Sequence, residues 1–389
     1  MPFSVFACGS NGGSQLGFGD DKDRHESERV KFRVGSETTT ELSEPIRAMA
    51  FGGNYSLAIL QDGSLLGAGS NTRGQLFSPE DVRQSSVFRP IESVSGVKFR
   101  RIACGWEFSV AETTEGDILV SGYGPNGELG LGKHFSLSTT GRAYAKLPIN
   151  SESKGGIGQL CTSIHSVIII FNNGEVYGWG NNKRGQLFAH NGDRTLKLVR
   201  EPHRITFAGG RRVLRVCMGR DFTVFMTTDA NNEVLDPIFR GKDNFNIESE
   251  LRSSKIDSDS FASMWATWTS VQVLTRDNHI LSIGSNIKCQ HYPKNADNCG
   301  PIDLVAIGSE HGVCTLDNDS TKAYAWGWGE HGNCGSVPDH MTKDGKPARD
   351  TFDHLNTIYE ARKDEKITKV FAGCATSFVE VEKIKRQAQ

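Results

Sequence analysis

Short runs of small and apolar residues recur along the whole chain, and Gly, Asn and Asp-Gly turn signals separate them. One kind of run carries a glycine near its end, and its seven copies read VFACGSN from Val5, LLGAGSN from Leu65, ILVSGYG from Ile118, VYGWGNN from Val176, VLDPIFRG from Val234, ILSIGSN from Ile280 and AYAWGWG from Ala323. A second kind lies between them, and its seven copies read AFGGNYS from Ala50, ACGWEFS from Ala103, LCTSIHS from Leu160, CMGRDFT from Cys217, MWATWTS from Met264, AIGSEHG from Ala306 and FAGCATS from Phe371. Such runs between turn residues are typical of short strands joined by tight turns.

The repetition of the two runs predicts the fold. A repeat of roughly 40 to 60 residues with about four short strands is the signature of a propeller blade. Seven copies predict an all-β, seven-bladed propeller over residues 1–383, followed by a short polar tail at 384–389. The chain begins with one kind of run and ends with the other. We therefore expect Val5–Gly9 and Phe371–Val381 to share one blade, which closes the ring and removes a free sheet edge.

Composition narrows the classes of partner. The 389 residues include 44 Lys and Arg against 46 Asp and Glu, and the net charge of −2 gives no general attraction to nucleic acid or to an anionic membrane. The first residues lack a signal-peptide pattern, and no window approaches 18 consecutive apolar residues. Nine cysteines without a CxxC pair are typical of reduced thiols. The sequence predicts a soluble protein of the cytoplasm, or also of the nucleus.

A glycine pattern near the C-terminus resembles a nucleotide-binding loop. Gly327, Gly329 and Gly332 stand in the order G-x-G-x-x-G, but no apolar helical stripe follows them, and a dinucleotide site needs that helix. The same spacing recurs in GYGPNG at 122–127, which is another copy of the repeat. We therefore interpret the pattern as a turn with glycines at positive φ, and we expect no cofactor.

Two His-x-x-Cys pairs offer possible zinc ligands. They are His311 with Cys314 and His331 with Cys334. His311, however, falls at a position where other copies of the second run place an aromatic residue or a histidine, namely Tyr55, Phe108, His165 and Phe222. The interpretation that both histidines belong to the scaffold is favoured, and no metal is expected.

The second run also indicates where a partner would bind. When its copies are aligned on their Ser or small residue, two positions after the glycine vary freely, and variable positions in a scaffold repeat are free to carry function. They hold Trp106, Glu107, Arg220, Asp221, Trp268 and Glu310, which we expect to project from one rim of the ring. Tryptophans among charges are typical of an interface centre. The alternative, that each tryptophan folds back on its own blade, stays open.

The remaining tryptophans are assigned by their place in the runs. Trp265 and Trp326 stand at strand positions and Trp179 at a strand end, so we expect them in the core. Trp328 could belong either to the core or to a partner-binding surface.

The repeats resemble a known family. GSNTRGQL, GYGPNGELGLG and ACGWEFSV are similar to the repeats of the regulator of chromosome condensation family, which are seven-bladed propellers, and the likeness covers nearly the whole chain. The segments IGSEHGVCTL, AYAWGWGEHGNCG and FAGCATSFVEV, with ACGWEFSV and MWATWTSV, resemble the fungal killer-toxin-insensitivity group within it. The chain departs from the family's repeat pattern at three places: polar insertions at about 20–45 and 336–366, and an eroded blade at about 234–250.

The resemblance implies a non-catalytic propeller that forms a heterodimer with a small CSL-type zinc-finger protein. Such a pair serves diphthamide synthesis on elongation factor 2 and Elongator-dependent modification of wobble uridines in tRNA. No direct contact with nucleic acid is implied. The candidate partner-binding residues are the six at the variable positions together with His311, Trp328, Glu330 and His331.

Two other functions stay open. Within the same family, a propeller can exchange the nucleotide of a small GTPase. An enzyme is a different class: the chain has no G-x-S-x-G elbow, H-E-x-x-H helix, P-loop or kinase signature. Carboxylates can still gather around a propeller mouth, so Glu107, Asp221 and Glu310 are the candidates for an acidic site. A raised carboxylate pKa would favour that alternative.

Overall fold

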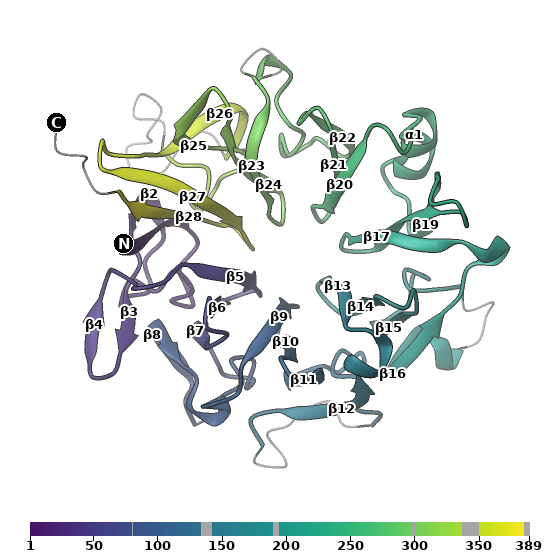
Figure 1. Cartoon of the computed structure of the whole chain (residues 1–389), viewed down its shortest axis with the longest axis horizontal. Coiled ribbons are helices and arrows are strands. Elements are labelled where there is room, and N and C mark those ends of the chain that lie inside the picture. Colours follow the sequence, from purple (N-terminus) through teal and green to yellow (C-terminus); the bar gives the residue numbers. More distant parts are fainter. Residues whose placement is uncertain (80, 134–141, 190–193, 297–299, 337–349, 385–389) are drawn as a thin grey trace.

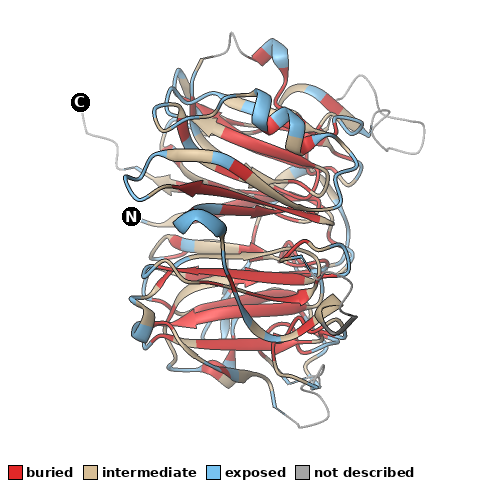
Figure 2. Cartoon of the chain, turned by 90° about the vertical axis from the view of Figure 1, so that its right-hand side faces the viewer, coloured by how far each residue is buried: buried red, intermediate tan, exposed pale blue. Residues whose placement is uncertain are grey.

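Seven sheets, in which every strand pair but β3–β8 is antiparallel, form a closed ring in the computed structural model, as the sequence predicts (Figure 1). The structure describes residues 1–389 except 80, 134–141, 190–193, 297–299, 337–349 and 385–389, so most of the predicted polar tail lies outside the described residues. Each sheet is one blade, and its first strand lies at the central channel. Buried residues follow the strands of the stacked blades, and exposed residues lie mostly in the loops (Figure 2).

The first three blades have four strands each. Blade 1 contains β5 (Ile46–Phe51), β6 (Tyr55–Leu60), β7 (Leu65–Ser70) and β8 (Gln84–Pro90). Blade 2 contains β9 (Phe99–Cys104), β10 (Phe108–Thr113), β11 (Asp117–Gly122) and β12 (Ala145–Asn150). Blade 3 contains β13 (Ile157–Thr162), β14 (Ser166–Phe171), β15 (Val176–Asn181) and β16 (Leu198–Ile205).

Within the described residues, the next two blades have three strands each. Blade 4 contains β17 (Arg212–Met218), β18 (Phe222–Thr228) and β19 (Val234–Gly241), and blade 5 contains β20 (Phe261–Ala266), β21 (Ser270–Thr275) and β22 (Ile280–Gly284). The eroded stretch at 234–250 forms β19 and the start of the short helix α1 (Ile247–Ser253), which contacts β19 and β22. Blade 6 returns to four strands with β23 (Ile302–Ile307), β24 (His311–Leu316), β25 (Asp319–Trp328) and β26 (Thr351–Glu360).

Blade 7 joins the two ends of the chain. It contains β27 (Glu365–Ala372), β28 (Thr376–Lys383), β1 (Phe3–Gly9) and β2 (Arg24–Arg29), in the order β2-β1-β28-β27. Strands β1 and β28 form seven antiparallel residue pairs, from Phe3 with Glu382 to Gly9 with Thr376. The predicted closure of the ring is confirmed.

The two segments expected as polar insertions carry regular structure. Residues 20–45 supply β2, and then β3 (Phe32–Val34) and β4 (Glu37–Thr39), which join the outer edge of blade 1 through a bridge between Phe32 and Phe88. Residues 336–366 supply β26, the outer strand of blade 6, although 337–349 lie outside the described residues. The alternation of polar and apolar residues in β2 and β26 was too weak to distinguish these outer strands from insertions.

The core lies between neighbouring blades. Trp179 and Trp326 are fully buried, as expected, and each indole N–H donates to a carbonyl of the preceding blade: Trp179 to Glu128 at 2.7 Å and Trp326 to Gln290 at 3.3 Å. Five of the eight described cysteines are buried. No helix within the described residues is long and apolar enough to cross a membrane.

The G-x-G-x-x-G pattern lies in a turn at the end of β25. Gly327 and Gly332 adopt φ of +99° and +90°. A Cβ on Gly332 would lie 2.3 Å from the carbonyl oxygen of Arg24, so a side chain there would collide with the backbone of the closing blade. The glycines therefore allow a left-handed backbone and a close approach between blades, which supports the interpretation as a turn.

Candidate partner-binding site at the channel mouth

Two arcs of backbone hydrogen bonds, together called the belt, lie along one mouth of the channel, one over blades 1–3 and the other over blades 4–7. The belt is formed by the three-residue loops that join the first and second strands of each blade. The middle residue of a loop donates its N–H to the loop of the next blade, from Gly53 to Trp106, from Trp106 to Ile164, from Arg220 to Trp268, from Trp268 to Ser309 and from Ser309 to Gly373, at 2.8 to 3.1 Å. Because these bonds link separate blades, they fix the loops of each arc relative to one another.

The pairing of the strands corrects the alignment of two of the repeats. Strand pairing places Ser166 opposite Gly180 and Ser270 opposite Gly284, just as Tyr55 lies opposite Gly69. These two serines therefore occupy the aromatic position, one residue earlier than the sequence alignment put them. Trp268 is consequently equivalent to Trp106, and His165 is equivalent to Glu107 and not to Tyr55.

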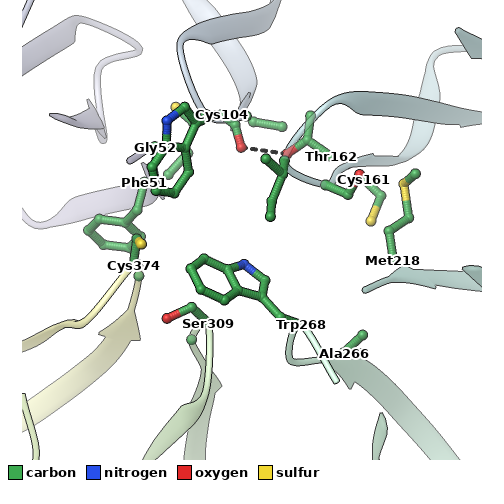
Figure 3. Close-up of a pocket in the computed structure, with 18 of the residues that line it drawn as sticks. Phe51, Gly52, Cys104, Cys161, Thr162, Met218, Ala266, Trp268, Ser309 and Cys374 are labelled. Carbon is green, nitrogen blue, oxygen red and sulfur yellow. Dashed lines mark hydrogen bonds between the residues drawn. The ribbon is translucent and has the colours of Figure 1, made fainter. Parts of the chain in front are cut away.

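Two tryptophans meet across the mouth. Trp106 comes from blade 2 and Trp268 from blade 5, yet their ring centroids are 6.3 Å apart with an angle of 52° between the planes. Trp106 is 38% exposed and Trp268 is partly buried. Figure 3 shows the ring of Trp268 extended from its loop into the middle of the pocket. Neither residue folds back on its own blade: Trp268 extends into the pocket (Figure 3), and the Trp106 ring lies against Gly53 of blade 1.

The channel below this pair is mainly apolar. It encloses a volume of about 370 Å³, and the side chains around it include Phe51, Ile102, Leu160, Met218 and Trp265. Trp265 is half-buried and lines the channel, which corrects its assignment to the core. A tryptophan at this strand position can face either the next blade or the channel, and the sequence does not distinguish the two.

Charged side chains stand beside the tryptophans. Glu107 lies 3.6 Å from Arg73, and Arg220 lies 3.3 Å from Asp221. Arg73 also stacks on the ring of Tyr123, at 4.7 Å from its centroid. The side chains of Glu107 and Arg220 are 37% and 52% exposed, so these predicted rim residues can be reached from solvent.

Glu310 does not project from the rim, which corrects that expectation. It is 6% exposed, and the Thr269 hydroxyl lies 2.9 and 3.0 Å from its two carboxylate oxygens and donates to the carboxylate. Gln290 in turn donates to the Thr269 hydroxyl at 2.8 Å. Burial raises the pKa of Glu310 to about 7, although the Thr269 bond and the charge of Arg220 act in the opposite direction.

His311 is also buried, and it joins two blades. It is fully inaccessible, and its Nε2 lies 3.1 Å from the hydroxyl of Ser377 in blade 7. Tyr55 makes the same kind of contact between blades 1 and 2, where its hydroxyl accepts a bond from Ser109 at 3.0 Å. Burial lowers the pKa of His311 to about 4. His311 is therefore a scaffold residue and cannot touch a partner directly, which corrects its place among the candidate residues.

A second exposed group lies on blades 5 and 6. Trp328 is partly buried, the ring of His331 stands nearly perpendicular to it at 5.5 Å, and the Lys288 Nζ lies 5.7 Å from its ring centre. The Trp328 indole N–H is buried and has no hydrogen-bond partner among the described residues. His331 Nδ1 lies 2.8 Å from a carboxylate oxygen of Asp23, and Glu330 is exposed.

Sequence reasoning missed two residues of this region. Lys288 contacts Trp328, and the neighbouring Ile287 is 81% exposed. Ile287 occupies a turn position at which other blades carry Thr72 or Lys183. An isoleucine at a polar turn position was the available signal, because an exposed apolar side chain there has no role in the scaffold.

The His-x-x-Cys pairs do not form a metal centre. Cys314 lies buried on β24 with His311, and the Cys334 thiol is buried within 3.4 Å of the Trp326 carbonyl oxygen. Within the residues that the structure describes, no group of three or more His, Cys, Asp or Glu side chains is placed to hold a metal ion. The expectation that the chain binds no metal stays a prediction.

Comparisons with known proteins agree with this architecture. The model of the regulator of chromosome condensation (RCC1) repeat matches residues 62–111 and 173–226, and a second model of that repeat matches residues 46–75. The RCC1 repeat-containing protein C10F6.04 of Schizosaccharomyces pombe is 26% identical over 85% of this chain and 88% of its own length. The mouse secretion-regulating guanine nucleotide exchange factor is 26% identical over 85% of this chain and 64% of its own length.

Solved structures share the fold. Prp20p of Saccharomyces cerevisiae superimposes with a TM-score of 0.77 and 20% identity, over 100% of this chain and 93% of Prp20p. At this identity the likeness concerns the fold alone. The chain thus carries matches to the RCC1 repeat over residues 46–111 and 173–226, and it shares the seven-bladed propeller fold with Prp20p.

Proposed function

We propose that this chain is a non-catalytic protein-binding propeller whose tryptophan-bearing mouth binds a small CSL-type zinc-finger protein. The observation that carries the proposal is the Trp106–Trp268 pair, which presents two large aromatic rings at the centre of one face. Interface centres are enriched in tryptophan, tyrosine and arginine and are surrounded by polar residues. Arg73, Glu107 and Arg220 supply such a polar surround.

The rigidity of the mouth supports the same proposal. Ordering flexible loops on binding lowers affinity, so a surface that is already ordered binds more tightly for the same contacts. The loop of each tryptophan is bonded to the loops of both neighbouring blades before any partner arrives. The group at Trp328, Lys288 and His331 extends the face towards blade 6.

The identity of the partner rests on the resemblance to the killer-toxin-insensitivity group. On that basis the complex would be a heterodimer that supports diphthamide synthesis on elongation factor 2 and Elongator-dependent wobble-uridine modification of tRNA. The test is a calorimetric titration of the full chain with the zinc-loaded CSL protein. We expect a one-to-one complex, and the absence of heat or of a co-eluting complex at micromolar concentrations would contradict the proposal.

A second candidate is nucleotide exchange on a small GTPase. It is favoured by the mouse relative, which is named a guanine nucleotide exchange factor, and by Prp20p, whose structure is reported with its binding to Gsp1p and histones. An exchange assay with a panel of GTPases loaded with fluorescent nucleotide separates the two candidates. Accelerated release from one GTPase, without binding of the zinc protein, would favour exchange.

An acidic catalytic site is less well supported. Glu310 has the raised pKa that such a site needs, but Thr269 occupies its carboxylate. Glu107 and Asp221 each lie beside an arginine, and no hydrogen bond joins any two of the three carboxylates among the described residues. Two carboxylates that share a task should lie within reach of one reacting group. The arrangement therefore favours binding over catalysis.

A further inference from the structure

Arg240 occupies a position that tryptophan fills in two other blades. It stands just before Gly241 at the end of β19, as Trp179 stands before Gly180 and Trp326 before Gly327. The Arg240 Nη1 donates to the carbonyl oxygen of Leu187 in the preceding blade at 2.7 Å, which reproduces the bond that each indole makes. An arginine therefore takes the structural place of the indole but adds a charge.

That charge has no carboxylate partner among the described residues. The guanidinium lies 4.9 Å from the ring centre of Phe207 and 5.4 Å from that of Phe225, so aromatic faces compensate part of it. Burial lowers the pKa of Arg240, and no acidic neighbour opposes that effect. Arg240 is half-buried, and a cation that is partly withdrawn from water is commonly paired or holds an anion.

The unused donors of Arg240 face a hollow. Arginine carries five N–H groups, and the bond to Leu187 uses one of them. Arg240 lines a hollow of about 390 Å³ together with Arg184, Gly185, Ala189 and Gly241. These lining residues include two arginines and no acidic residue.

Arg184 supplies the second cation. It is exposed, and no ion pair holds its side chain among the residues that the structure describes. Its turn is fixed, because its backbone N–H donates to the side chain of Gln186 at 3.0 Å and Gly185 donates to the Asn182 carbonyl at 2.9 Å. One guanidinium is thus anchored by a backbone carbonyl, and both arginines line the hollow.

We propose that the hollow between blades 3 and 4 binds a phosphate monoester dianion through Arg184 and Arg240. Two guanidinium groups match the double charge and the several acceptor oxygens of a terminal phosphate, and planar arginine forks bind phosphate with two parallel bonds. A phosphodiester carries a single charge on each phosphate, and the chain has no basic field to collect a polyanion. The favoured source is a phosphorylated serine or threonine of a protein, and free inorganic phosphate has the same chemistry.

The competing explanation is that Arg240 only replaces the tryptophan as a packing group. The variant Arg240→Trp separates the two explanations, because it restores the residue of blades 3 and 6 and should keep the fold while it removes the buried charge. Arg184→Gln removes the second cation at the surface, where the fold does not depend on it. Thermal melting of both variants shows whether each is folded.

The experiment is a calorimetric titration of the full chain with three probes at moderate salt. They are inorganic phosphate, a short neutral peptide with one phosphoserine, and the same peptide without the phosphate. We expect the phosphopeptide or inorganic phosphate to bind, and each variant to weaken that binding by roughly tenfold or more, as for the loss of one charge-assisted pair. Phosphopeptide binding without inorganic phosphate binding identifies a protein source, and the reverse identifies free phosphate.

Three results would overturn the inference. One is the absence of binding by both phosphate probes at millimolar concentration. Another is equal binding by the unphosphorylated peptide. The third is binding that Arg184→Gln and a folded Arg240→Trp both leave unchanged. If Arg240→Trp does not fold, the Arg184→Gln titration alone decides, because that side chain lies at the surface.

Discussion

At the residue scale, Glu310 shows how closure of the ring buries a carboxylate at the mouth and gives it a hydrogen-bond partner from another blade. Sequence alignment put this glutamate at an exposed variable position, but the loop of blade 5 covers it and Thr269 bonds to it. Because Thr269 lies 41 positions earlier in the chain, no local pattern predicts this contact. The same holds for His311, whose partner Ser377 lies 66 positions later.

We predict that Glu310→Gln makes the protein more stable at alkaline pH. The folded pKa of about 7 lies above the ordinary value of 4.5, so the folded state holds a proton that the unfolded state releases. Stability should therefore fall as pH rises from 4.5 to 7, by up to about 3 kcal/mol for this group. Glutamine still accepts the Thr269 bond but carries no charge.

Urea unfolding at pH 5 and pH 8 measures this effect. The free energy of unfolding should differ less between pH 5 and pH 8 in Glu310→Gln than in the original chain. Glu107→Gln is the matched control, since that exposed carboxylate should matter little. An unchanged pH dependence in Glu310→Gln would show that the glutamate does not titrate in this range.

We predict that His311→Phe makes the stability of the protein less sensitive to acid. This pH dependence is opposite to that of Glu310, which costs stability as the pH rises. The folded pKa of about 4 lies below the ordinary 6.5, so the unfolded state binds the proton first. Stability is then lost as pH falls from 6.5 to 4, by up to about 3 kcal/mol. Phenylalanine occupies the equivalent position in blade 2 as Phe108, so the variant should fold.

Thermal melting at pH 4.5 and pH 7 tests this expectation. The variant should lose less stability on acidification than the original chain does, although the loss of the bond to Ser377 lowers its stability at both pH values. The same drop in both proteins would mean that another group causes the acid sensitivity.

At the scale of single elements, β1 is the strand on which the closed ring depends most. Its seven pairs with β28 cover an edge that would otherwise be free, and free edges pair with other chains. We predict that deletion of residues 1–10 causes aggregation and lowers the melting temperature by about 10 °C or more. Light scattering and calorimetry measure both.

A peptide of residues 1–10 provides the control for this deletion. Added in excess to the truncated chain, it should restore the melting temperature in part, because the missing strand can pair without a covalent link. A truncated chain that stays monomeric with an unchanged melting temperature would contradict the role of β1.

The elements differ in how far the sequence predicts them. The inner strands and the closing pair β1–β28 follow from the two repeated runs, because their burial on both sides forces a regular pattern of small and apolar residues. The outer strands β2 and β26 were not recognised, since an outer strand is half exposed and its sequence is free to vary. The missing fourth strands of blades 4 and 5 and the helix α1 were not predicted for the same reason.

At the scale of the whole molecule, the candidate site exists only because the ring is closed. Trp106 and Trp268 were both named from the sequence, but their contact across the channel could not be predicted, since it depends on the geometry of seven blades. Glu310 and His311 fail as surface residues because neighbouring blades cover them. Ile287 and Lys288 lie in a turn of the other kind of run, so the variable positions of the second kind of run do not indicate them.

The central claim is that the face with the Trp106–Trp268 pair binds the partner, and Trp268→Ala tests it most directly. The variant should remain folded, because the lost ring contact contributes only about 0.5 to 1.5 kcal/mol. Leu214→Ala is the control: this leucine is 44% exposed near the start of β17, at the end of the strand remote from the mouth loops.

The deciding measurement is a calorimetric titration of the original chain, Trp268→Ala and Leu214→Ala with the zinc-loaded CSL protein. A buried aromatic anchor contributes on the order of 2 kcal/mol, so Trp268→Ala should bind roughly thirtyfold more weakly or worse, while Leu214→Ala binds as the original does. Unchanged binding by a folded Trp268→Ala, or a loss that its thermal melting attributes wholly to unfolding, would contradict the account and place the partner on another part of the ring.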